Sequence, residues 1–474
     1  MADDTVWRYL WHMTARSISS LLLFTPIFIF SIAAAPNDDK TVESPPAAPS
    51  VSPEPPVKKG ATPTGQNIIF IHPDGAGLSG WNIHRILRHG PDGHSHWDLL
   101  PRMAVYRAHM RDNLDASSHG GGTIHAYGVK VLKDSFGMNG KKPLKSASGY
   151  PGSIMMEARD AGLSIAIINS GHLAEPGTAC MLASVESRTM REAVAAQLIE
   201  SGADLIFGGG EVLFLPEGTK GVHGGNGLRT DGRNLVEEAK KAGYRVIYRK
   251  ADLATISSDT PKILGLFAAE NTYNDLDEET LEARSLPLYD PAAPDVAEMT
   301  AAALRWLTAR GRPYFLMVEE EGTDNFANVM NAAGMMEAYR RADDAIAVAR
   351  KQVVAYPNST TLLVAADSEA SCPVLIPFGT QTSQPKGEKL RRLPGTTAVG
   401  APLDGSAGTG TVPFVTEPDR VGQRHLFGIA WIDGGDHFGG VLARAEGARA
   451  DRLPINLDNT GIYHFLREVL LKDD

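Results

Sequence analysis

The sequence predicts an α/β protein, a three-layer αβα sandwich in which helices cover both faces of a large, mostly parallel central sheet. Beyond Gln66, short apolar runs alternate with stretches of helical periodicity, as βα repeats require. Several of these runs are apolar throughout, which is typical of strands that are buried on both faces. The run NIIFIHP (67–73) leads directly into Asp74 and a glycine-rich turn. Polar groups at such strand ends predict a ligand or catalytic site at that edge of the sheet.

The elements can be placed along the chain from these patterns. Helices are expected at 295–311, with Asp295 as the N-cap and Gly311 as the stop signal, and at 333–356. Residues 376–425 are rich in Gly, Pro, Thr and Ser, which predicts an irregular insertion: a substrate-rim element, a subunit contact or a simple surface excursion. The expected strands, in chain order, are 67–73, 163–170, 203–210, 244–249, 262–268, 313–322, 360–367 and 425–432.

The N-terminus has the layout of an export signal. Arg8 and Arg16 precede an apolar run that ends in small residues, so residues 1–35 are expected to be a signal peptide and the protein to be exported, periplasmic or secreted. An uncleaved anchor is the alternative, although the run is short for a membrane span and Pro26 interrupts it. After cleavage no stable membrane insertion is expected. Residues 36–64 predict a disordered linker rich in Pro, Ser and Ala, followed by a catalytic domain at 65–474.

The net charge and the two cysteines bear on possible partners and on disulfide formation. The formal net charge of -10 and the lack of a basic face argue against a nucleic-acid partner. Cys180 and Cys372 are the only cysteines, and in an exported protein they could form a disulfide or remain free and buried.

Five motifs carry side chains suited to catalysis. Asp74 can approach a cation because small residues follow it. The segment DASSHGGGTIHAYGVK (115–130) predicts a hydroxyl at the start of a helix, where a phosphate would bind. Acidic residues follow the strands in 313–331 and 360–371, and His437 lies in the glycine-rich segment 433–447. Adjacent buried acids are costly unless water or cations solvate them.

Taken in order, these motifs resemble the alkaline phosphatase family, and the resemblance covers residues 66–471. Segments without chemistry match as well, among them RTDGRNLVEEAKKAGY and DNTGIYHFLREVL. The resemblance implies a serine phosphomonoesterase with two zinc sites and a nearby magnesium site. It implies Ser118 as the nucleophile, with Ser117 one residue away as the alternative, and Arg188 as the group that holds the phosphate through its two-pronged guanidinium.

The resemblance also implies a set of metal ligands. Asp74 matches the carboxylate shared between zinc and magnesium, while Glu319 and Glu175 match magnesium-side positions. Asp367 matches a ligand of the zinc that activates the serine, and Asp324 and His437 match ligands of the other zinc.

Two positions depart from the family pattern. Ser368 and Asn328 stand where the family has histidines. Oxygen donors suit magnesium, manganese or calcium better than zinc, so magnesium is the expected cation and zinc binding is expected to be weakened. Glu369 or His119 would be candidates for a substitute ligand.

The expected function is metal-dependent hydrolysis of a small phosphate monoester through a phosphoserine intermediate, and the resemblance implies a homodimer. A phosphodiesterase on the same site is one alternative. A catalytically degenerate homologue that binds phosphate or metal is another.

Overall fold

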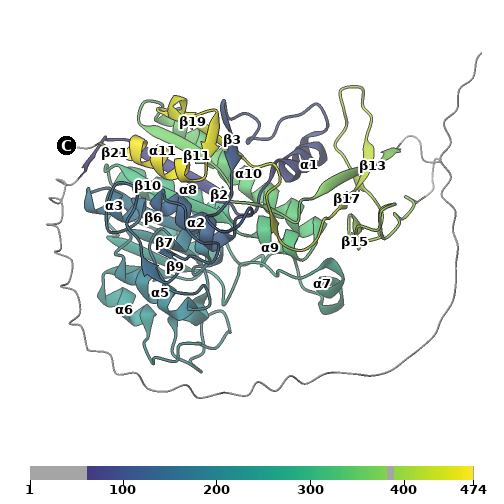
Figure 1. Ribbon diagram of the computed structural model, residues 1–474. Coiled ribbons are helices and arrows are strands. Elements are labelled where there is room, and N and C mark those ends of the chain that lie inside the picture. Colours follow the sequence, from purple (N-terminus) through teal and green to yellow (C-terminus); the bar gives the residue numbers. More distant parts are fainter. Residues whose placement is uncertain (1–60, 382–388, 473–474) are drawn as a thin grey trace, which may run out of the picture. The chain divides into compact units, whose positions relative to one another are not determined.

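The computed structural model describes residues 61–381 and 389–472, and a ten-stranded sheet lies at the centre of this part of the chain (Figure 1). The strand β19 is antiparallel to both of its neighbours, and every other neighbouring pair is parallel. The expected mostly parallel sheet is thereby confirmed. In spatial order the strands are β20 (Asn456–Asp458), β3 (Arg102–Arg107), β19 (Leu442–Gly447), β11 (Thr360–Val364), β2 (Asn67–Pro73), β10 (Tyr314–Glu320), β6 (Ser164–His172), β7 (Leu205–Gly209), β9 (Lys262–Leu266) and β8 (Tyr244–Ile247).

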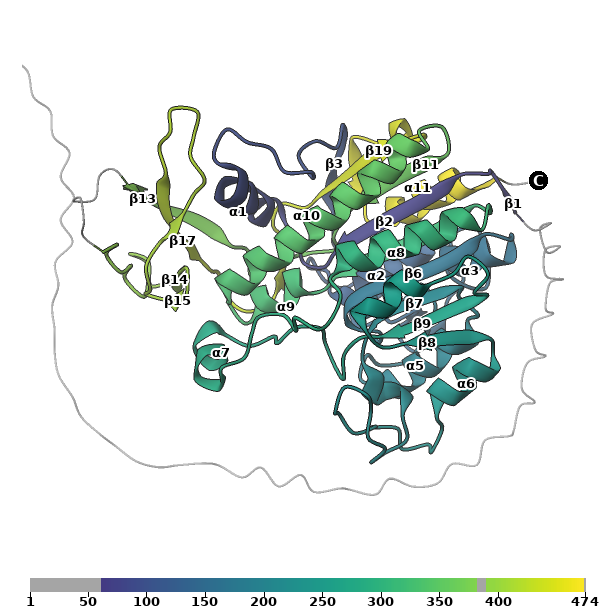
Figure 2. The same cartoon turned by 180° about the vertical axis from the view of Figure 1, so that it is seen from behind.

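Helices cover both faces of this sheet. On one face α8 (Val296–Ala309) and α10 (Ala332–Ala355) pack against the central strands, and on the other lie α3 (Ile154–Asp160) and α11 (Thr460–Leu470), as the two opposite views show (Figures 1 and 2). Consecutive residues Ile68 to Ile71 of β2 are therefore all fully buried. The predicted three-layer arrangement is confirmed.

The predicted N-cap of α8 is present. The Asp295 carboxylate accepts a hydrogen bond from the Glu298 amide at 2.8 Å, and the Glu298 carboxylate accepts one from the Asp295 amide at 3.1 Å. This reciprocal pair satisfies two amides at the helix start that have no partner within the helix. Gly311 follows the helix with a φ of 65°, a left-handed conformation that ends helices at little cost to glycine.

Shorter elements complete the folded part. The remaining helices are α1 (Leu78–His89), α2 (Ser118–Tyr127), α4 (Pro176–Ala179), α5 (Arg191–Glu200), α6 (Leu235–Lys241), α7 (Glu278–Arg284), α9 (Gly322–Asn328), and the 3-10 turns η1 (Glu211–Phe214), η2 (Lys250–Thr255) and η4 (Ala450–Arg452). Three two-stranded ladders pair β1 (Thr62–Pro63) with β21 (Leu471–Lys472), β4 (Met138–Asn139) with β5 (Lys142–Pro143), and β12 (Glu369–Ala370) with β18 (Asp436–His437).

A second, antiparallel sheet forms where the sequence predicts an irregular insertion. Its strands are β13 (Val374–Thr380), β14 (Leu403–Gly405), β15 (Gly408–Thr409), β16 (Phe414–Val415) and β17 (His425–Ala430). The segment 376–425 is thus partly ordered by strand pairing. The run 425–432, expected among the repeating strands of the main sheet, contributes β17 to this small sheet instead.

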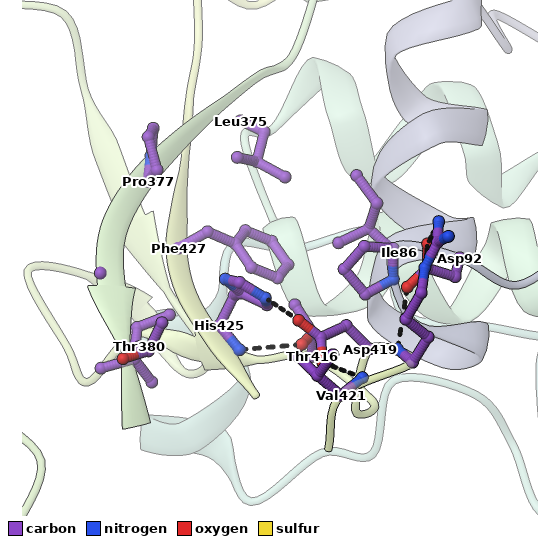
Figure 3. Close-up of a pocket in the computed structure, with 14 residues that line it drawn as sticks. Ile86, Asp92, Leu375, Pro377, Thr380, Thr416, Asp419, Val421, His425 and Phe427 are labelled. Carbon is purple, nitrogen blue, oxygen red and sulfur yellow. Dashed lines mark hydrogen bonds and ion pairs between the residues drawn. The ribbon is translucent and has the colours of Figure 1, made fainter. Parts of the chain in front are cut away.

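A cavity of about 650 Å³ lies between this small sheet and the C-terminal end of α1 (Figure 3). Its walls are mostly apolar and include Ile86, Leu375 and Phe427, and an ion pair between Asp92 and Arg420 lies at its edge. None of the predicted catalytic or metal-binding residues lines it.

Near its N-terminus, the described part of the chain begins within the predicted linker. The predicted signal peptide, 1–35, and residues 36–60 of the predicted linker lie outside the described residues. Thr62 and Pro63, also placed in the linker, instead form β1 and pair with β21 near the C-terminus.

Both cysteines are free, which excludes a disulfide between them in this structure. Among the described residues, no helix has the length and apolar character needed to span a membrane.

Candidate active site

Carboxylates from three neighbouring strands meet at one edge of the main sheet. Asp74 follows β2, Glu319 is the penultimate residue of β10, and Asp367 follows β11. Because β2 lies between the two others and all three run parallel, their C-terminal ends share this edge. All three side chains are fully buried.

Several carboxylate oxygens at this edge of the sheet are buried without a hydrogen-bond partner among the described residues. Both oxygens of Asp74 and one each of Glu319, Glu321, Asp324 and Asp367 are buried without a hydrogen-bond donor in the part of the chain that the structure describes. Oxygen atoms of Asp74, Glu321 and Asp324 lie within 4.8 Å of one another. Burial, followed by repulsion from neighbouring carboxylates, raises the pKa of each of these three groups well above its usual range. Divalent cations would remove this penalty, so the donor set fits them.

A histidine lies directly beside this set. His72 precedes Asp74 by two residues on β2 and is fully buried, with Nδ1 at 3.3 Å from Glu319 Oε1 and Nε2 at 3.9 Å from Asp367 Oδ1. Glu319 is itself held in place because its Oε2 accepts from Asn169 Nδ2 at 2.5 Å and from the Thr178 amide at 2.7 Å. A carboxylate at Nδ1 leaves Nε2 as the donor, which is how metal-binding imidazoles are commonly oriented.

The ring of His72 lies close to both acids, and this contact shifts its pKa. Burial lowers the pKa of His72, but Glu319 and Asp367 outweigh burial and raise it overall. Binding of a cation would therefore release a proton from this histidine. Donor atoms of His72, Asp74 and Asp367 lie within 4.8 Å of one another, so Asp74 is common to two candidate metal sites.

The short helix α9 carries the next group of ligands. Asn328 Nδ2 donates to Asp324 Oδ2 at 2.8 Å, and Asn328 Oδ1 is buried without a donor among the described residues. The four-residue spacing places both side chains on one face of the helix. Asp436 on β18 approaches the same amide at 3.5 Å and raises the pKa of Asp324 further, after burial.

Ser117 and Ser118 lie in different environments. Ser117 caps α2: its Oγ accepts from the Gly120 amide at 3.2 Å and donates to the Lys133 carbonyl at 2.6 Å. Ser118 is the first residue of the helix and is buried. The same helix passes close to the carboxylates, because a Cβ on Gly121 would lie 2.4 Å from the Cβ of Asp367.

Arg188 lies in the segment between α4 and α5 and contacts Glu175. Its Nη2 is 3.5 Å from Glu175 Oε2, and the side chain is 48% exposed. The other oxygen of Glu175 lies 2.9 Å from His172 Nε2. Burial alone would raise the pKa of Glu175, but His172 and Arg188 lower it overall. Glu175 is thus already paired with cations of the chain, unlike Asp74.

Four further residues named from the sequence make different contacts, and that of Ser368 is with Asp367, one of the acids described above. His437 pairs with Asp433, and Ser368 Oγ donates to Asp367 Oδ1 at 3.4 Å. Of the suggested substitute ligands, Glu369 accepts from the amides of Ser79 and Gly440, so backbone groups occupy its carboxylate. His119 lies 3.6 Å from Asp134, and burial together with Arg188 lowers its pKa to about 4.

Comparison with known proteins identifies this arrangement. The family profile described as alkaline phosphatase matches residues 65–388. The chain belongs to the alkaline phosphatase family. An alkaline phosphatase of Escherichia fergusonii is 24% identical over 353 residues, which cover 66% of this chain and 71% of that protein. The streptomycin-6-phosphate phosphatase of Streptomyces griseus is 25% identical over 342 residues, which cover 64% of this chain and 73% of that protein.

Solved alkaline phosphatases share the fold. The enzyme from the Antarctic bacterium TAB5 superposes with a TM-score of 0.63 at 18% identity, covering 86% of this chain and 98% of that one. A mutant of that enzyme has been solved with magnesium bound. Membership in the alkaline phosphatase family supports a phosphoester hydrolase that uses divalent metals, and the unpartnered carboxylates described above fit such cations.

Three residues of the candidate active site were not identified from the sequence as ligands: His72, Glu321 and Asp436. His72 could have been found from strand alternation, because residues two apart on β2 face the same side. Glu321 is one of three adjacent acids at the end of the run 313–322, and the family resemblance assigns only Glu319 of these. Glu320 faces the opposite side, where Ser170 and Tyr289 donate to it.

Proposed function

We propose that this member of the alkaline phosphatase family hydrolyses small phosphate monoesters through a phosphoserine at Ser118. One observation carries the proposal: the serine that starts α2 lies on a helix packed against Asp367, one of several buried carboxylates that have oxygens without a hydrogen-bond donor among the described residues. The Ser117 hydroxyl is engaged in the helix cap, which supports Ser118 as the nucleophile.

The reaction divides into two displacements at phosphorus. In the first, Ser118 Oγ gives up its proton to water and forms a bond to phosphorus, the ester P–O bond breaks, and the leaving alkoxide takes up a proton from water. In the second, a water oxygen attacks phosphorus, the bond to Ser118 breaks, and serine recovers its proton as phosphate leaves. Arg188 would hold two phosphoryl oxygens, and the amides at the start of α2 would stabilise their negative charge. Bound divalent cations would supply the Lewis-acid charge that favours deprotonation of the serine and the water.

The ligands divide between the two candidate sites. Asp74, Asp324 and Glu321 would hold one cation, with Asn328 beside them. His72, Asp74 and Asp367 would hold the other. Oxygen donors predominate, so magnesium is the expected cation, with manganese and calcium as alternatives. His72 would restore one nitrogen ligand, which leaves a weakened but real zinc affinity at the second site. Glu319 and Ser368 remain proposed ligands, since Glu319 Oε1 has no hydrogen-bond donor among the described residues and Ser368 Oγ contacts Asp367. Glu175 and His437 would first have to leave their present partners.

The setting of the enzyme is part of the same proposal. The basic and apolar pattern of residues 1–35 supports export to the periplasm or outside the cell, and the family resemblance supports a homodimer. The physiological partner would be a small phosphate ester.

Reconstitution of activity tests the proposal. The mature protein, residues 36–474, is stripped with chelator and reloaded with magnesium, zinc, manganese or calcium, singly and in pairs. Hydrolysis of a chromogenic phosphate monoester is then measured for the wild type and for Ser118→Ala. The proposal expects turnover that requires both a cation and Ser118.

Other outcomes separate the alternatives. Turnover of a chromogenic phosphodiester in preference to the monoester would replace the proposal with a diesterase on the same site. Absence of turnover with every cation, in a protein whose circular dichroism is native, would indicate a catalytically degenerate binding protein.

A further inference from the structure

A second group of metal-binding side chains lies away from the acidic edge of the sheet, between α1 and α10. His84 and His89 belong to α1, Asp343 belongs to α10, and one donor atom of each lies within 4.8 Å of the others. The two helices pack side by side in both views (Figures 1 and 2). None of these three residues takes part in the proposed phosphoryl transfer.

His84 is the least explained member of this group. It is 1% exposed, and neither ring nitrogen has a hydrogen-bond partner in the part of the chain that the structure describes. A buried polar group without a partner costs free energy, so such groups are rare and call for a specific explanation. The ring is fixed by Trp81, which packs against its edge at 6.2 Å between centroids and stacks on Trp97 at 5.1 Å.

Asp343 is held in a fixed orientation. Its Oδ1 accepts from the Trp97 amide at 2.8 Å and its Oδ2 from the His96 amide at 3.0 Å. Each oxygen keeps a free lone pair, and Oδ2 lies 3.7 Å from His84 Nε2. This separation is longer than a hydrogen bond, but two ligands of one cation can be this far apart.

A buried His–Asp ion pair is the simpler account of these two residues. It leaves His89 unexplained, because that exposed side chain at the end of α1 brings its own nitrogen to the same point, with ring centroids 5.8 Å from His84. An exposed third ligand also leaves a coordination position open to water.

We propose that His84, His89 and Asp343 bind one zinc-class divalent cation that links the end of α1 to α10. Two imidazoles and one carboxylate form a nitrogen-rich set of the kind that zinc prefers, with water as the fourth ligand. This set contrasts with the oxygen-rich carboxylates at the sheet edge, so magnesium should not compete for it.

Metal content is the direct test. The mature protein and its variants are dialysed to equilibrium against zinc in the presence of excess magnesium, which favours occupation of the acidic edge by magnesium, and bound zinc is measured by mass spectrometry. His89→Asn changes an exposed side chain and is expected to fold normally, which circular dichroism checks. We expect it to lose one equivalent of zinc per chain relative to the wild type.

Matched variants make the result decisive. His94→Asn removes an exposed histidine from the neighbouring loop and should leave zinc content unchanged. In the cobalt-loaded protein, His89→Asn should also change the visible absorption spectrum. Unchanged zinc content in both His84→Asn and His89→Asn, or an equal loss in His94→Asn, would overturn the proposal. Because zinc content is measured without substrate, the result does not depend on phosphatase activity.

Discussion

At the scale of single residues, Ser117 and Ser118 are neighbours with separable roles. Ser118→Ala is expected to abolish turnover because it removes the proposed nucleophile. Ser117→Ala removes the N-cap of α2, which should lower the free energy of unfolding by about 1 kcal/mol while turnover persists. Steady-state kinetics and thermal melts of both variants measure this division. The reverse pattern, with activity lost only in Ser117→Ala, would move the nucleophile by one residue.

His72 yields a second prediction at the same scale. If its Nε2 supplies the nitrogen that Ser368 cannot, His72→Ala should weaken zinc binding at least tenfold, and magnesium binding much less. Competition with a chromophoric chelator measures both affinities. His125→Ala is the control, because His125 is equally buried but bonds to the Tyr106 hydroxyl at 2.6 Å instead of to a carboxylate. Equal losses in the two variants would show a packing effect rather than lost coordination.

At the scale of elements, the glycines of α2 allow the helix to approach the acidic edge. A methyl group on Gly121 would meet Asp367 Cβ at 2.4 Å, which no ordinary contact allows. Helix propensity alone predicts that Gly121→Ala stabilises the protein by about 1 kcal/mol. We expect the clash to win, so that thermal stability and cation affinity both fall, as melts and metal titrations would measure. Gly395→Ala should change neither, because its new methyl group would find only ordinary contact at 3.5 Å.

The same scale shows what sequence reasoning can reach. Strands such as β2 and β10 were predicted because both of their faces are buried and each contains an unbroken run of apolar residues. The strand β3 was not predicted. One of its faces is exposed, but that face carries Met103 and Val105, so the sequence RMAVYR shows neither a long apolar run nor an alternation of apolar and polar residues. The acids at strand ends were found because they directly follow recognisable apolar strands. Which of Glu319 to Glu321 are ligands could not be predicted, because the answer depends on where β10 ends. His437 carries the right residue type, but its contact with Asp433 depends on loop geometry.

At the scale of the whole molecule, folding gathers buried carboxylates at one edge, which ties stability to pH and to cations. Asp74, Glu321 and Asp324 have pKa values well above those of exposed acids, chiefly because of burial, so without cations the folded state binds more protons than the unfolded state. The chelated protein should therefore lose stability as pH rises from the unfolded-state pKa of about 4 through the raised folded-state values.

Cations should reverse this loss. Magnesium at about a hundred times its dissociation constant would add about 2.7 kcal/mol to the free energy of unfolding. Its affinity should grow as pH rises through the raised pKa values of these ligands and they lose their protons, which thermal melts with magnesium or chelator would show. Asp74→Asn with Asp324→Asn removes two of the buried charges, so this double variant should depend less on both pH and magnesium. A chelated wild type that gains stability over the same pH range would contradict the model of a site built for cations, because its carboxylates would then be compensated within the chain itself.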